Sequence, residues 1–504
     1  MQIDHIIVQA GGKGTRLEHL TANKPKALVP VENLPMLFHL FRKFPDKRYV
    51  IIADYKKDVL RKYLACFANV KYCIVEAAGT GTCSGVRQAA ALLPDGVPFM
   101  LVWSDLILPD GFALPTEDAD FIGISQTFPC RWRYQSGEFA EDRSTEHGVA
   151  GLFVFRDKTT LNGVPESGEL VRWMRERNFR FSELGLSGTR EFGLLSEYEA
   201  LGQEKCRPFN KITIDGDTVV KEPVDEQGRR LAKLESAWYR TAKEKGVSGI
   251  PRIYETEPLR MERIRGKNIY EYTALPLSEK RTILEKLVCT LKELHSKESI
   301  PADAFSLRDA YYGKTMARLN QIRDLVPFAD RRTITVNGRE CRNVFYHQRE
   351  LEQALERIKC GHFAFIHGDC TFSNMMLRED GTPVLIDPRG YFGRTELYGD
   401  PAYDWAKLYY SVVGNYDQFN RKRFDLDIGE DSVTLRIAYN GWEELEPVFF
   451  GLLGDDVSPA QIHLLHAIIW LSLTTYAWED YDSICGAFYN GLYYLEEVLD
   501  ENVF

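Results

Sequence analysis

Three polar side chains in the C-terminal half have the types and spacing that phosphoryl transfer requires. Residues 367–374 read HGDCTFSN, and Asp387 follows the apolar run at 384–386. Transfer of a phosphoryl group to a neutral hydroxyl needs a carboxylate that accepts the proton and oxygen ligands for Mg²⁺. We predict that Asp369 accepts the proton and that Asn374 and Asp387 bind the metal.

A glycine-rich segment near the N-terminus has the composition of a phosphate-binding loop. Residues 9–17 read QAGGKGTRL and directly follow the apolar run at 6–8. Glycines let the backbone approach a phosphate chain and direct N–H groups toward it, and the Arg16 guanidinium can hold two phosphate oxygens at once. The sequence KPKAL at 24–28 adds two cations held by a rigid proline. These features predict a second phosphate-binding site.

The elements that position this loop alternate along the chain before residue 205. Apolar runs predict buried strands at 6–8, 49–53, 72–75 and 99–103. Helical spacing predicts helices between them, at 36–43, 58–67 and 86–93. Strands that alternate with helices favour an α/β fold with a mostly parallel, doubly wound, Rossmann-like sheet.

The pattern changes near residue 205. Two alternating runs at 211–214 and 218–221 flank a glycine-containing turn and predict a β-hairpin. A helix is expected at 229–243. From residue 275 the sequence predicts mainly helices, with one compact loop-and-strand segment at 365–390.

We therefore predict two domains in the 504 residues, at 1–205 and 206–504. The second should have a small lobe at about 206–265 and a helical large lobe at about 266–504. A net charge of −10 without a basic stripe argues against a nucleic-acid partner. The start of the chain lacks signal-peptide features, and the apolar stretch at 463–478 is too short to span a bilayer. We expect a cytoplasmic protein that binds small molecules and spans no membrane; a homo-oligomer is compatible with the sequence.

The N-terminal motifs resemble those of nucleotidyltransferases that make nucleotide sugars and related activated alcohols, including phosphocholine nucleotidyltransferases. The resemblance covers about residues 1–205. It implies a nucleotide held by Gly11, Gly12, Gly14 and Thr15, catalytic phosphate contacts from Arg16 and Lys26, a second glycine-rich segment with Gly79 and Gly81 near the base, and Mg²⁺ ligands at Asp105 and Glu191.

Two parts of this pattern differ from the family. Trp103-Ser104-Asp105 replaces the usual Gly-Asp, and Glu191-Phe192-Gly193 stands where the family often has Asp-x-Gly. Mg²⁺ accepts either carboxylate, so Glu191 can still serve as the second ligand. The alternative is that Glu191 is an ordinary surface glutamate.

The C-terminal motifs resemble the aminoglycoside phosphotransferase and choline kinase group, relatives of the protein kinases with two α+β lobes. The resemblance implies that Lys221 contacts the ATP phosphates, that Glu235 pairs with Lys221, and that Glu262 lies in the hinge beside adenine. The sequence GDPAYDWA at 399–406 resembles the group's structural tail. His367 is interpreted as an orienting residue and His295 as scaffold.

One difference bears on the substrate. Choline kinases of this group commonly have Asp-Trp-Glu at the metal aspartate, whereas this chain has Asp387-Pro388-Arg389-Gly390. Arg389 is an unfavourable neighbour for a cationic substrate. A cationic choline would also need an aromatic or acidic pocket.

The two predicted activities fit one reaction sequence with ATP, a second nucleoside triphosphate and Mg²⁺ at both sites. A kinase makes a phosphomonoester, and a nucleotidyltransferase consumes one. We expect a bifunctional enzyme that activates a sugar or polyol for surface polysaccharide, capsule or lipid synthesis. The first alternative is a choline kinase and CTP:phosphocholine cytidylyltransferase that makes CDP-choline; the second is a nucleotide-binding sensor or scaffold with an inactive first domain. The sequence leaves open the acceptor, the second nucleotide and channelling of the intermediate.

Overall fold

The computed structural model describes residues 1–199 and 210–500. The chain divides into two compact units, the first comprising Met1–Gln203 with Glu479–Tyr481 and the second Glu204–Trp478 with Asp482–Phe504. The predicted boundary between residues 205 and 206 lies outside the described residues.

The sheet of the first unit contains a parallel half with the order β6-β1-β4-β5. Its strands are β1 (His5–Gln9), β4 (Arg48–Ala53), β5 (Lys71–Glu76) and β6 (Phe99–Trp103). The chain adds β4 and β5 on one side of β1 and then returns to place β6 on the other side. Open α/β sheets bind ligands at such a reversal, outside the carboxyl ends of the strands.

The other half of this sheet is largely antiparallel, so the sheet is mixed. It begins at β11 (Gly148–Phe155), which runs antiparallel to β6. The remaining strands are β8 (Phe121–Ser125), β9 (Arg133–Gln135), β10 (Glu138–Ala140) and β12 (Ser182–Gly185). The α/β class is confirmed, whereas the parallel arrangement holds only for the part built from alternating strands and helices.

Helices cover the parallel half, and strand residues alternate between two apolar environments. These helices are α1 (Met36–Lys43), α2 (Lys57–Phe67) and α3 (Val86–Ala91). Ile7 and Val50 share a buried cluster with Val86 of α3. The neighbouring Tyr49 instead packs edge-on against Phe41 of α1, with ring centroids 4.8 Å apart.

The predicted burial of the third strand is wrong. β5 forms the last strand of the parallel half, and Cys73 in its centre is exposed. The apolar run reflects a strand at the sheet edge, where one side of the backbone has no neighbouring strand.

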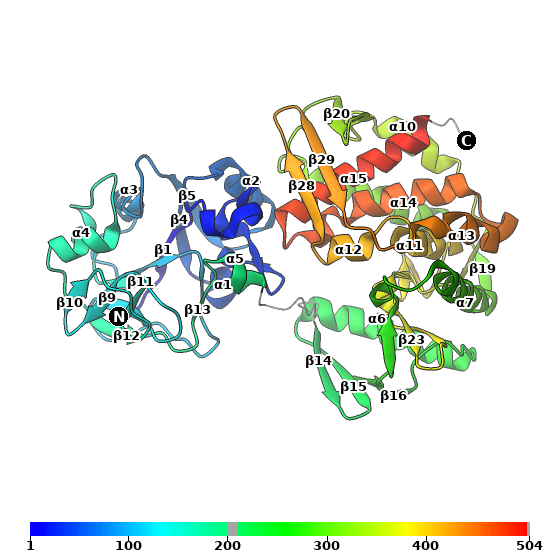
Figure 1. The fold of residues 1–504 in the computed structure, drawn as a ribbon, viewed down its shortest axis with the longest axis horizontal. Coiled ribbons are helices and arrows are strands. Elements are labelled where there is room, and N and C mark those ends of the chain that lie inside the picture. The colour runs from blue at the N-terminus through cyan, green and yellow to red at the C-terminus, as the bar shows by residue number, and fades with distance from the viewer. Residues whose placement is uncertain (200–209, 501–504) are drawn as a thin grey trace. The chain divides into compact units, whose positions relative to one another are not determined.

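The second unit begins with an antiparallel sheet in the order β14-β15-β17-β16. Its strands are β14 (Asn210–Asp215), β15 (Thr218–Pro223), β16 (Ile253–Thr256) and β17 (Leu259–Glu262). Helix α6 (Glu226–Glu244) packs against β15 and is capped by the Asp225 side chain, which accepts a 2.6 Å hydrogen bond from the Gly228 amide (Figure 1). The predicted hairpin and helix are confirmed.

The rest of the second unit is mainly helical around one apolar cluster that includes Trp238, Tyr410 and Trp470. Within it, α11 packs on α14 (Figure 1). Its principal helices are α7 (Leu277–Ser296), α9 (Lys314–Ile322), α11 (Pro401–Val412), α14 (Pro459–Leu473) and α15 (Tyr481–Asp500). Over the described residues, no helix is both long and apolar enough to cross a membrane.

One sheet of this region is missing from the sequence-based prediction. It has the order β21-β20-β29-β28 and joins segments about 100 residues apart. Its strands are β20 (Thr333–Val336), β21 (Arg339–Arg342), β28 (Phe424–Ile428) and β29 (Ser432–Ile437). The strands are short, and the pairing that joins the β20–β21 and β28–β29 hairpins depends on a distant partner rather than on local pattern.

Candidate active sites

The first site is built at the point where the parallel sheet reverses. β1 ends at Gln9 and continues into the glycine-rich loop, while β6 ends at Trp103 and continues to Asp105. The two strands pair in register from His5 with Phe99 to Gln9 with Trp103. The loop and Asp105 therefore leave the same edge of the sheet side by side.

The glycines of this loop have different surroundings. A Cβ on Gly11 would lie 2.8 Å from Cβ of Asp54, whereas Gly12 has no neighbour within 4 Å. Gly14 has a φ of 66° and lies against the Lys26 stem, so the turn brings the loop and the KPK segment together. Thr15 follows on the exposed surface.

Lys26 and Asp105 form an ion pair in the first site, with side chains only 11% and 14% exposed. The second oxygen of this carboxylate, Oδ1 of Asp105, is buried and accepts no hydrogen bond. An unsatisfied buried carboxylate oxygen is costly unless a cation or donor faces it. This oxygen is therefore suited to bind a metal ion.

Glu191 joins this group through a short strand pair. β13 (Arg190–Glu191) runs antiparallel to β7 (Leu106–Ile107), with Glu191 opposite Leu106. The side chains of Glu191 and Arg16 both lie close to Gly193. Burial and the Asp105 charge raise the pKa of the Glu191 carboxyl and Lys26 and Arg16 lower it, which together place it at about 7. The predicted carboxylates and cations thus converge, and Glu191 is partly buried rather than an ordinary surface residue.

The second glycine-rich segment is fixed by its contacts with residues 166–170. A Cβ on Gly79 would lie 1.9 Å from the Glu166 carbonyl oxygen, and one on Gly81 would lie 2.4 Å from that of Gly168. The Gly168 amide donates to the Thr80 carbonyl at 2.9 Å. Glycine is required here because two backbones are in direct contact.

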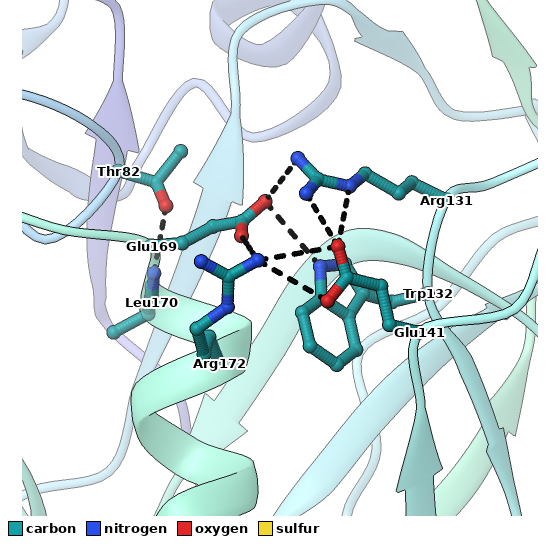
Figure 2. Close-up of polar contacts among 7 residues, drawn as sticks. All are labelled: Thr82, Arg131, Trp132, Glu141, Glu169, Leu170 and Arg172. Atoms are coloured by element: carbon teal, nitrogen blue, oxygen red, sulfur yellow. Dashed lines mark hydrogen bonds and ion pairs between the residues drawn. The ribbon is translucent and has the colours of Figure 1, made fainter.

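Figure 2 shows how side chains hold this segment in place. The Leu170 amide donates to Oγ1 of Thr82 at 2.8 Å, and the adjacent Glu169 accepts from Arg131 at 3.0 Å and from Trp132 at 3.3 Å. Arg172 connects the same glutamate to Glu141. The network links the start of α4 (Leu170–Glu176) to the β9–β10 hairpin.

Gln9 is a positioning residue that the sequence-based prediction does not include. Its side-chain amide donates to the carbonyls of Thr82 at 2.7 Å and Ser84 at 3.2 Å. It therefore ties the end of β1 to the second glycine-rich segment. Its position at the end of the first strand, two residues before Gly11, was the available signal.

The second site contains a largely buried lysine between two carboxylates. Nζ of Lys221, on β15, donates to Glu235 of α6 at 2.7 Å and to Asp387 at 2.8 Å. Burial alone would lower the pKa of Lys221, but the Asp387 and Glu235 charges raise it above its ordinary value. Burial raises the pKa of the Glu235 carboxyl. The structure brings these three predicted residues into contact.

Asp369 and Asn374 form the other part of the second site. Nδ2 of Asn374 donates to the Asp369 carboxylate at 2.9 Å. Lys407, which the sequence-based prediction missed, contacts the other oxygen of Asp369 at 3.1 Å. Asn374 directly precedes β23 (Met375–Arg378), and Asp387 closely follows β24 (Pro383–Leu385), so both lie at the open end of this antiparallel hairpin, where Met375 pairs with Leu385. This hairpin sets their separation.

The loop that carries Asp369 is held by one buried carboxylate, Asp404. Oδ2 of Asp404 accepts from the His367 amide at 2.8 Å, and Oδ1 accepts from the Gly368 amide at 2.7 Å. Nε2 of His295 lies 3.0 Å from Oδ2. His367 is fully buried, and its ring contacts the Ile386 carbonyl and the Asp369 amide. These contacts agree with an orienting role for His367 and a scaffold role for His295.

Glu262 lies at the end of β17 but its side chain is engaged elsewhere. Arg378 donates to both Glu262 oxygens, at 2.5 and 2.9 Å. This pairing lowers the pKa of the Glu262 carboxyl to about 2. A contact with adenine would therefore come from the backbone of this segment rather than from the carboxylate.

Both sites have the donors expected for Mg²⁺ that is bound mainly through a substrate. Mg²⁺ commonly uses one or two carboxylates together with substrate phosphates and waters. Asp105 and Glu191 would hold it in the first site, and Asn374 and Asp387 in the second. Among the described residues, no group of three or more His, Cys, Asp and Glu side chains could hold a metal ion.

Two family models match the chain. The model described as nucleotidyl transferase matches residues 5–119, and the phosphotransferase enzyme family matches residues 211–447. Each half of the chain thus contains a segment that resembles one of these two families. Both are transferase families, which confirms the predicted resemblance in each half and the predicted enzyme class.

Individual relatives cover smaller parts. The bifunctional protein GlmU of Methanocaldococcus jannaschii is 31% identical over 108 residues, which are 21% of this chain and 25% of the relative. The mannose-1-phosphate guanylyltransferase catalytic subunit beta of Dictyostelium discoideum is 31% identical over 115 residues, or 21% of this chain and 32% of the relative. The chain thus spans about a quarter to a third of these relatives' length. The structure of choline kinase LicA from Streptococcus pneumoniae covers 58% of this chain and 91% of its own, with 14% identity and a TM-score of 0.39.

The contact between glycine-rich backbones predicts the effect of Gly79→Ala. The added methyl group would overlap the Glu166 carbonyl, so we expect the first unit to lose roughly 1–3 kcal/mol of stability. Gly111→Ala is the matched control, since no atom lies within 4 Å of its added Cβ. Thermal unfolding of both variants measures the difference; equal midpoints would contradict the packing described.

The pKa of Glu191 predicts how magnesium affects the first site. Below about pH 7 the carboxyl is protonated and binds Mg²⁺ poorly, so the Mg²⁺ concentration needed for pyrophosphate release should fall as the pH rises through 7. Glu191→Gln should need more Mg²⁺ and lose this dependence, keeping only a change near pH 6 from the substrate phosphate. Pyrophosphate release assayed across Mg²⁺ concentrations and pH tests this; identical curves for the two proteins would exclude Glu191 as a ligand.

The Asp404 contacts predict that Asp404→Asn destabilises the second unit. An asparagine can direct its oxygen at only one of the two amides, so its NH₂ group would face the other donor. We expect a loss of about 2–4 kcal/mol and reduced ATP turnover. Denaturant unfolding should show no such loss for Asp425→Asn, an exposed change on β28; comparable stability of the two variants would contradict the anchoring role.

Proposed function

We propose that this chain is a bifunctional enzyme that phosphorylates a hydroxyl compound and then joins the phosphomonoester to a nucleotide. The observation that carries the proposal is the grouping of phosphate-handling residues in both units. Lys221, Asp369 and Asp387 gather in one unit, and Lys26 and Asp105 gather in the other. Each group lies within the segment that matches the corresponding transferase family.

In the second site, the acceptor hydroxyl oxygen attacks the γ-phosphorus of ATP. The bond from that phosphorus to the β–γ bridging oxygen breaks, and ADP leaves with this oxygen. Asp369 accepts the hydroxyl proton, while Lys221 holds the ATP phosphates and Glu235 holds Lys221. Mg²⁺ held by Asn374 and Asp387 would supply charge neutralisation for the phosphates.

In the first site, an oxygen of the phosphomonoester attacks the α-phosphorus of a nucleoside triphosphate, and pyrophosphate leaves. The second pKa of a phosphomonoester is near 6, so the attacking oxygen is already ionised at neutral pH. The step therefore needs no general base. Its main requirement is to hold two anions together, which Arg16, Lys26 and the loop amides would do. Mg²⁺ bound at Asp105 and Glu191 would neutralise further phosphate charge.

For the substrate, we infer a sugar or polyol that becomes a nucleotide-activated precursor for surface polysaccharide or lipid synthesis. The name of the Dictyostelium relative refers to a sugar 1-phosphate, which supports a sugar over an amino alcohol. ATP would serve the second site and a second nucleoside triphosphate the first.

Reciprocal substitutions test the assignment of the two reactions. Asp105→Asn should lower pyrophosphate release at least 100-fold while ADP formation continues, because one oxyanion or metal contact contributes about this much. Asp369→Asn should do the reverse when the phosphomonoester is supplied. Asp118→Asn and Asp427→Asn, both exposed, are matched controls. Mass spectrometry of reactions with ATP, the other nucleoside triphosphates and pooled sugars, polyols and amino alcohols identifies the products; binding of nucleotides without any turnover would instead favour a sensor.

A further inference from the structure

Cations from three segments gather beside Asp369 in the second unit. Lys314 and Arg318 lie one helical turn apart on α9, and Lys407 lies on α11. Arg389 follows the predicted metal ligand Asp387 by two residues. We call these four side chains the cation cluster.

Contacts with the Tyr403 ring link two members of the cluster, and electrostatic interactions link the other two to them. Nζ of Lys314 lies 5.4 Å from the Tyr403 ring centroid, and Nζ of Lys407 lies 6.0 Å from it. Lys407 also contacts Asp369 at 3.1 Å. Arg389 acts electrostatically on Lys314 and on Tyr403. The cluster therefore surrounds Tyr403 and reaches the residue proposed to accept the proton.

The cluster has too few negative charges around it. Asp369 is the one carboxylate among the groups that act most strongly on these side chains. Arg318 donates to the carbonyl and hydroxyl of Ser472, which are neutral. No described residue forms an ion pair or hydrogen bond with the Lys314 ammonium group. Four cations therefore face one carboxylate, and unpaired charge in a partly buried site is unfavourable.

The titration of two members of this region reflects the same imbalance. Burial and the neighbouring cations lower the pKa of the Lys314 ammonium to about 8, although Tyr403 acts in the opposite direction. Burial would raise the pKa of Tyr403, but Lys314, Lys407 and Arg389 lower it to about 7. The local field thus favours an anion strongly enough to promote ionisation of a phenol.

Tyr391, which contacts one member of the cluster, also lines a cavity large enough for a small molecule. The Arg389 guanidinium donates to the Tyr391 hydroxyl at 2.9 Å. Tyr391, with residues of α6 such as Arg230 and Leu234, lines a cavity of about 570 Å³. Pockets for small ligands commonly have volumes of roughly 300–1,000 Å³.

We propose that the hydroxyl acceptor of the second site is itself an anion, an alcohol that carries a carboxylate or a phosphate bound by the cation cluster. The inference rests on the proposed kinase function and specifies its substrate class. The cluster holds the negative group while the hydroxyl faces Asp369. A cationic amino alcohol such as choline would be repelled by the same charges, and an uncharged polyol would leave them unpaired.

Matched acceptors provide the first test. ADP formation should be compared for glycerate, glycerol 3-phosphate and glycerol, for glucuronate and glucose, and for choline and ethanolamine. We expect turnover of at least one anionic member and at least tenfold lower kcat/KM for its neutral counterpart. Comparison of glycerate with glycerol 3-phosphate shows whether the site requires a carboxylate or a phosphate on the acceptor. Preferred turnover of glycerol, glucose, choline or ethanolamine would overturn the proposal.

Charge removal at Lys314 and Arg318 provides the second test. Lys314→Met and Arg318→Met should each raise KM for the anionic acceptor at least tenfold and leave KM for ATP within about twofold. Arg281→Met, on the exposed face of α7, is the control and should leave both constants unchanged. An increase in KM for ATP alone would assign the cluster to ATP rather than to the acceptor, and would overturn the proposal.

Ligand binding without turnover provides the third test, which applies even when the panel does not contain the acceptor. In a thermal shift assay without nucleotide, the anionic panel members should raise the unfolding midpoint of the wild type more than that of Lys314→Met. The absence of any such difference, together with no anionic turnover, would overturn the proposal. Failure of the kinase function is a separate result: ADP formation would then be unaffected by Asp369→Asn for every acceptor.

Discussion

Carboxylates in a partly buried site need opposite charges, and this constraint organises both active sites. Each site pairs a carboxylate needed for chemistry with a lysine: Lys26 with Asp105, Lys221 with Asp387, and Lys407 with Asp369. In the protein alone, the lysine of each pair supplies the opposite charge that the carboxylate needs. A bound nucleotide would bring phosphates for the lysines and, with magnesium, a countercharge for the carboxylates. The lysine–carboxylate pairs of the two sites can therefore be replaced by lysine–phosphate and carboxylate–magnesium pairs when the nucleotide binds.

The sequence predicts the parts of the sites that are set by local structure. Gly14 turns the first loop and Asp369 follows a short strand because nearby residues determine these conformations, and both lie where the motifs indicate. The parallel half of the first sheet follows equally from alternating strands and helices. The edge position of β5 does not follow from its own residues, because it depends on which other strands the sheet contains. The β20–β29 pair is also missed, because its two strands come from distant segments of the chain.

Partners that come from distant segments are the main features that sequence reasoning could not supply. Lys407 reaches Asp369 from a helix that begins 32 residues later, and no spacing rule connects them. Lys314 comes from a helix that precedes the motif altogether. Only Arg389, adjacent to a recognised motif, indicated that the acceptor site was unsuited to a cation. The other three cations, which only the structure places beside Arg389, are the basis for proposing an anionic acceptor. Such an acceptor would also give the first site a more negative phosphomonoester to bind.

In the proposed reaction sequence, the phosphoryl group added in the second site becomes part of the product made in the first. ATP labelled with ³²P at the γ-position can follow this group, in reactions with an anionic acceptor and unlabelled CTP, GTP, UTP and dTTP. We predict that label appears first in the phosphomonoester and then in the nucleotide-activated product, while the released pyrophosphate stays unlabelled. A nucleotide-activated product without label, or label that remains in the phosphomonoester when all triphosphates are present, would contradict the account.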